Sequence, residues 1–113
     1  MPFIDCKLTK KLNEEQKEKI KSELGQAVSV IHKPESYLMV GINDSYDLYF
    51  AGKKLDNGAY VSVSLFGSST PAAYEKMTET ICGILETELG VNGSSVYVTY
   101  HEVDNWGWDG ANF

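Results

Sequence analysis

The chain has 113 residues and a mass of 12.6 kDa, which predicts a single domain over residues 1–113. Hydrophobic residues make up 42% and charged residues 23%, a globular composition that excludes a disordered or collagen-like chain. The net charge is −6 and all ten basic residues are lysines. This disfavours binding to nucleic acid, because proteins recognise bases and bind phosphates largely through arginine. Because no apolar run is long enough to span a bilayer and an acid lies near the start, we expect neither membrane insertion nor a secretory signal peptide.

The first half of the chain predicts a β-α-β unit over residues 2–43. Apolar and other residues alternate over 2–8, which indicates a half-buried strand. Asn13 has the chemistry of a helix cap, and an apolar stripe over 20–31 predicts a helix. Lys33-Pro34 should end it, because the residue before a proline avoids the helical conformation. Two further strands are expected, over 37–42 and, at an edge, over 48–50.

The second half repeats this plan over residues 59–101. Alternation over 59–66 predicts a strand. Thr70 and Pro71 are suited to a helix start, an apolar stripe follows, and Gly90 is suited to the helix end. Another strand is expected over 96–100, followed by a tail over 105–113 that is rich in aromatic residues and glycine.

This order predicts an α/β fold made of two β-α-β units, an internal duplication. Each crossover should be right-handed, and each pairs two parallel strands. We therefore expect a four-stranded mixed sheet, extended by short edge strands, with both helices on one face. The helix-free face carries Phe3, Phe66, Tyr97 and a residue at or near Met39, so a second subunit should cover it.

Common catalytic and phosphate-binding motifs are absent from the sequence. Cys6 and Cys82 lie in apolar patterns, so we expect both to be buried thiols. The two histidines lack the spacing of metal ligands, and we expect no metal and no cofactor. The N-terminus is the remaining candidate for a catalytic group. Removal of Met1 would leave Pro2 as a free secondary amine, which is a general base if its pKa falls toward neutrality. Taken by itself, a Met-Pro start favours the interpretation that it has no function.

Four segments together resemble the macrophage migration inhibitory factor (MIF) family of the tautomerase superfamily. They are Met-Pro-Phe-Ile at the start, Lys33-Pro34-Glu35-Ser36-Tyr37 after the first helix, Val96–Tyr100 in the last strand, and Gly107-Trp108 with Phe113 in the tail. The similarity covers essentially the whole chain, including its length and the repeated plan. It implies the tautomerase/MIF-like fold and a homotrimer with pockets between subunits.

The resemblance also implies roles for particular residues. Pro2 would be the catalytic base, and Lys33 would bind the acidic end of the substrate and keep the proline neutral. Tyr97 would enter the pocket from a neighbouring subunit, while the backbone N–H of Phe66, preceded by Leu65, would bind the substrate. The other pocket residues would be Tyr37, Trp106, Trp108 and Phe113 as an aromatic wall, with Thr99 where the mammalian proteins have asparagine. We expect Trp106 to narrow the mouth, and the hydrogen bond at Thr99 to be weaker or rearranged.

The implied activity is keto–enol tautomerisation of a small aromatic α-keto acid such as phenylpyruvate. This chemistry needs a base near neutrality, donors for an oxygen and a cation for a carboxylate. The alternative is a cytokine-like ligand of a cell-surface receptor with a vestigial tautomerase site. Hydration or dehalogenation of unsaturated acids is disfavoured, because the chain has no arginine. A cytoplasmic location, or export without a signal peptide, is expected.

Retention of Met1 would change the chemistry of the Pro2 nitrogen. While it is attached, the Pro2 nitrogen is a tertiary amide without a basic lone pair. We therefore expect the unprocessed chain to be inactive, with Met1 crowding the pocket near Lys33 and Tyr97.

Overall fold

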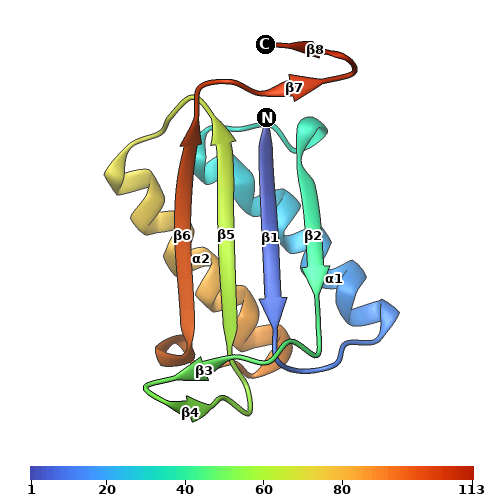
Figure 1. Ribbon diagram of the computed structural model, residues 1–113, viewed down its shortest axis with the longest axis vertical. Coiled ribbons are helices and arrows are strands. Elements are labelled where there is room, and N and C mark those ends of the chain that lie inside the picture. The colour runs from blue at the N-terminus through green and yellow to red at the C-terminus, as the bar shows by residue number, and fades with distance from the viewer.

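The computed structural model describes residues 1–113 as two β-α-β units that share one sheet (Figure 1). The sheet order is β2-β1-β5-β6; β1 is parallel to β2, β5 is parallel to β6, and β1 is antiparallel to β5. Both helices cover the same face (Figure 1), which confirms the predicted architecture. The main elements are β1 Pro2–Leu8, α1 Glu14–Ala27, β2 Met39–Asn43, β5 Ala59–Phe66, α2 Pro71–Leu89 and β6 Val96–Val103.

Local chemistry determines where the first helix begins and ends. The Asn13 side chain accepts a hydrogen bond from the Gln16 N–H at 2.8 Å, and the Gln16 side chain accepts one from the Asn13 N–H at 3.0 Å. The α-helix ends earlier than predicted, at Ala27, and continues as the 3₁₀ turn η1, Val28–Ile31. His32 stops it with a left-handed φ of 63°, so the chain changes direction just before Lys33. A second 3₁₀ turn, η2 (Glu35–Tyr37), delays the next strand to Met39.

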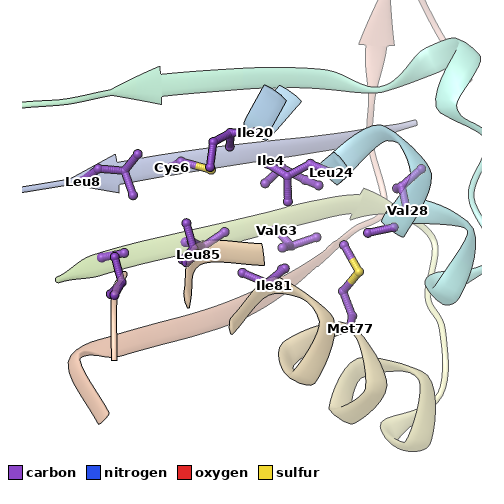
Figure 2. Packing of buried hydrophobic residues seen from close by; sticks show 14 of the residues in the cluster. Ile4, Cys6, Leu8, Ile20, Leu24, Val28, Val63, Met77, Ile81 and Leu85 are labelled. Atoms are coloured by element: carbon purple, nitrogen blue, oxygen red, sulfur yellow. The ribbon is translucent and has the colours of Figure 1, made fainter. Parts of the chain in front are cut away.

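The face of the sheet under the helices holds the hydrophobic core (Figure 2). Ile4, Val63 and Ile81 are fully buried there. Cys6 is buried beside them, and burial raises the pKa of its thiol to about 12. Cys82 on α2 is a free thiol that is only partly buried, so the prediction of two buried thiols is wrong for this residue, which sits at the side of the helix rather than beneath it.

The opposite, helix-free face is polar at its centre. Asp5 and Lys7 form an ion pair of 2.6 Å on β1. The hydroxyls of Tyr60 and Thr99 lie 2.8 Å apart, and Thr99 Oγ1 lies 3.0 Å from His101 Nε2. The apolar character expected for this face is confined to its two ends, and its cover by a second subunit stays a prediction.

Two hairpins lie outside the main sheet. The edge strand expected over 48–50 forms as β3 (Tyr49–Phe50), but it pairs with β4 (Lys53–Lys54) and does not extend the main sheet within one chain. The tail forms β7 (Gly107–Trp108) and β8 (Ala111–Asn112). Asp109 and Gly110 between them have φ of 51° and 81°, the positive values that a tight two-residue hairpin turn requires. This hairpin lies at the end of the sheet where the chain begins (Figure 1).

Candidate active site

A cavity of about 660 Å³ opens at the end of the sheet where β1 begins. Its walls come from the chain start, the segment before β2, the end of β5 and the tail. Most of its lining is apolar. The lining includes Met1, Pro2, Tyr37, Ser64, Trp106 and Trp108. Four residues predicted for the site therefore lie around one space.

Met1 connects Pro2 with two further predicted residues. Its carbonyl oxygen accepts a hydrogen bond from the Phe66 N–H at 3.0 Å. Lys33 Nζ donates to the Phe66 carbonyl oxygen at 3.0 Å and forms no salt bridge. Burial, and then the positive charge of Lys33, lower the pKa of the Met1 amine. The N-terminus and a cation without a carboxylate partner therefore lie side by side.

Aromatic side chains form a continuous row beside the cavity. The Tyr37 ring meets Trp108 edge to face at 5.9 Å, and Trp108 stacks on Phe113 at 6.2 Å. Phe113 lies 5.8 Å from Phe66, and its N–H donates to the Trp106 carbonyl at 3.0 Å, which fixes the tail across the site. Tyr37, Trp108 and Phe113 are more than half exposed, at 51%, 57% and 55%, so in a single chain this wall faces solvent.

Three predicted site residues lie elsewhere. Tyr97 is at the far end of the open face, 64% exposed and 5.6 Å from Phe50. The Thr99 hydroxyl lies near the middle of β6 and is already engaged by two neighbours. The Leu65 side chain is fully buried on the helix-covered face. Alternation along β5 leaves Leu65 only its backbone, which pairs with Pro2.

Besides the predicted Tyr37, the cavity is lined by two serines that were not predicted as site residues, Ser36 and Ser64. The position of Ser64 is predictable from the sequence, because the alternation over 59–66 places its side chain on the same face as that of Phe66. No group of three or more histidine, cysteine or acidic residues is arranged to hold a metal ion.

The fold and the N-terminal pocket together define an α/β protein of the MIF/tautomerase superfamily. The sequence profile described as "Macrophage migration inhibitory factor (MIF)" matches residues 1–113. The chain therefore belongs to the MIF family. A search of curated proteins found no match. None of the helices has the length and apolarity needed to cross a membrane.

Solved structures of related proteins superpose on nearly the whole chain. Leishmania major MIF2 is 27% identical, with a TM-score of 0.93 over 100% of this chain and 97% of that one. The macrophage migration inhibitory factor-like protein of Entamoeba histolytica is 29% identical, with a TM-score of 0.88 over 99% and 98%. A fused 4-OT described as a symmetric trimer is 18% identical, with a TM-score of 0.86 over 97% and 94%, and shows the shared fold.

Proposed function

We propose that the protein is a keto–enol tautomerase of aromatic α-keto acids such as phenylpyruvate, with Pro2 as the general base after removal of Met1. The observation that carries this proposal is the meeting of the N-terminus, the unpaired cation of Lys33 and a mostly apolar cavity at one end of the sheet. A base, a site for a carboxylate and a surface for an aryl group are the three parts that this reaction needs.

The surroundings of Pro2 favour a neutral amine. Burial and the charge of Lys33 lower the pKa of the Met1 amine, and Pro2 is more deeply buried than Met1. The same two effects would act on a Pro2 amine freed at this place, because both disfavour the protonated form. A secondary amine with a lowered pKa is available as a base near neutral pH.

Removal of Met1 also frees a hydrogen-bond donor. The Phe66 N–H now donates to the Met1 carbonyl, and Lys33 Nζ lies on the carbonyl side of the same residue. After processing, the N–H and the ammonium group would bind the substrate carboxylate, with the aryl group against Tyr37 and Trp108. Pro2 then takes a proton from the carbon next to the keto group, and the protonated amine gives a proton to the carbonyl oxygen, which becomes the enol hydroxyl. The reverse transfers return the ketone and the neutral amine.

The same proposal includes a homotrimer in which Tyr97 completes the pocket of a neighbouring subunit. Its support is the pair of unlike exposed aromatic ends, the Tyr37–Trp108 wall at one and Tyr97 with Phe50 at the other. Unlike surfaces pair head to tail, and such contacts form a ring when the rotation from one subunit to the next closes, as a threefold rotation does. Sedimentation is expected to give the mass of three chains; a monomer at micromolar concentration would contradict the assembly and the shared pocket together.

The activity is tested by an enol–keto assay with phenylpyruvate, on protein whose N-terminal Pro2 is verified by mass spectrometry. Pro2→Ala and Pro2→Gly should lower kcat about 100-fold or more, the usual size of a general-base contribution. Their sedimentation and thermal unfolding should match those of the unsubstituted protein. Full activity in both variants would exclude Pro2 as the base and favour the receptor-binding hypothesis.

A further inference from the structure

We propose that the Ser64 hydroxyl binds the reacting oxygen of the substrate and stabilises the enolate as it forms. This inference deepens the proposed tautomerase function and rests on it. Ser64 lies on β5 directly opposite Phe3, one residue from Pro2, and its side chain lines the cavity. It is half-buried, and its hydroxyl makes no hydrogen bond within the chain although it is not sealed from solvent. A hydroxyl without a partner in an apolar cavity is available to a ligand.

Three other donors close to Pro2 or on the open face have other partners or other roles in the proposed function. Lys33 Nζ and the Phe66 N–H are needed for the carboxylate. Thr99 Oγ1 lies 2.8 Å from the Tyr60 hydroxyl and 3.0 Å from His101 Nε2, so its one proton is shared within that chain of contacts. The other two cavity hydroxyls, those of Ser36 and Tyr37, lie in the exposed turn η2, on the side assigned to the aryl group.

The position of Ser64 along β5 fits an α-keto acid. Ser64 and Phe66 are successive residues on one face of the strand, and such residues lie about 7 Å apart. The carboxylate and carbonyl oxygens of one α-keto acid are neighbours, so one molecule can accept from the Phe66 N–H and from Ser64 together. Pro2 pairs with Leu65 between these two donors, so the base lies next to both.

The role of Ser64 follows from where charge develops. As Pro2 takes the proton from carbon, the electron pair of the broken C–H bond forms the C=C bond and the carbonyl π pair moves onto oxygen. The Ser64 O–H donates to that oxygen, and the hydrogen bond strengthens as the oxygen becomes negative. A contact that is stronger in the transition state than in the ketone raises kcat and leaves KM nearly unchanged.

The test compares Ser64→Ala with Ser62→Ala in protein with a verified Pro2 N-terminus. Both serines are half-buried on the same face of β5 and lack a hydrogen bond within the chain, but only Ser64 lines the cavity. We expect Ser64→Ala to lower kcat for phenylpyruvate at least about tenfold with KM within about twofold, since loss of an oxyanion donor commonly costs more than this. Ser62→Ala should keep the original kcat and KM.

Two further variants keep the test decisive. Ser64→Thr retains the hydroxyl and should retain most of kcat, whereas Ser64→Cys keeps the size of the side chain with a weak donor and should behave like Ser64→Ala. If Ser64→Ala and Ser64→Cys match Ser62→Ala in kcat while the unsubstituted protein is active, Ser64 does not bind the reacting oxygen. If the unsubstituted protein with free Pro2 shows no tautomerase activity, the proposed function itself is wrong.

Discussion

The two faces of the sheet are built from alternate residues of the same strands, yet they carry opposite chemistry. On β1, Ile4 and Cys6 lie under the helices and are buried, whereas Asp5 and Lys7 pair with each other on the open face. The closed face holds the apolar contacts that stabilise the fold. The open face has little packing to maintain, so the end beside Pro2 is free to form a cavity. Substitutions on the two faces should therefore separate stability from activity.

The largest expected effect is the loss of activity when Met1 is retained. An N-terminal extension that blocks its removal should lower kcat/KM for phenylpyruvate about 100-fold or more, because the Pro2 nitrogen stays an amide. The Met1 carbonyl also stays on the Phe66 N–H. The helix-covered face is untouched, so the thermal midpoint should not fall. Equal rates for the blocked and the processed protein would rule out Pro2 as the base.

A substitution on the closed face should have the reverse profile. Ile81 is fully buried in the core, so Ile81→Ala is expected to lower the free energy of unfolding by about 2–5 kcal/mol. Ser62→Ala on the open face should change it by less than about 0.5 kcal/mol. Urea unfolding of both variants checks the contrast. A comparable loss in the two variants would mean that the open face is packed as tightly as the core.

Lys33→Ala is expected to weaken substrate binding and to shift the pH profile. A charge-assisted contact is worth about 1.5–3 kcal/mol, so KM for a carboxylate substrate should rise about tenfold or more, with little change for its ester. The charge of Lys33 contributes to the lowered pKa of the N-terminal amine. Its loss should raise the pKa of the Pro2 amine and move the acid limb of kcat/KM to higher pH. Equal effects on acid and ester would show that Lys33 does not bind the carboxylate.

The smallest effects concern the two thiols. Burial raises the pKa of Cys6 to about 12 and also raises the pKa of Cys82, so both are protonated at pH 8 and react slowly with a thiol reagent. Cys82, which is partly exposed, should be labelled first, and Cys6 only on unfolding. Since unfolded Cys6 ionises near its ordinary pKa while folded Cys6 stays protonated, stability should fall as pH rises from about 9. Rapid labelling of Cys6 in the native protein would contradict its burial.

Hydrophobic periodicity and helix-capping residues predict most of the architecture. Alternation gave β1 and β5, and Thr70 with Gly90 gave the bounds of α2. The departures are local: His32 ends the first helix and Ala51 turns the β3–β4 hairpin, both with a positive φ, which is uncommon for residues other than glycine. The apolar residues predicted for the open face occur, but the ion pair and hydroxyls between them leave its centre polar.

The site was less accessible to sequence reasoning. Pro2, Lys33 and Phe66 come from separate parts of the chain, and no spacing rule brings them together; the family resemblance supplied their association. The hydrogen bonds through Met1 and Phe66 show the contact directly.

The hydrogen bond between Met1 and Phe66 has a consequence for the order of maturation. In the folded chain the Met1–Pro2 bond lies against β5, Pro2 is buried, and the Met1 carbonyl is held by a strand from the middle of the sequence. A peptidase needs an extended, accessible chain end, which the paired strand does not offer. If Met1 is removed as proposed, we expect the cut to be faster while β5 is still unsynthesised or unpaired than in the folded chain; incubation of folded and of unfolded protein with a methionine aminopeptidase, followed by mass spectrometry, checks this.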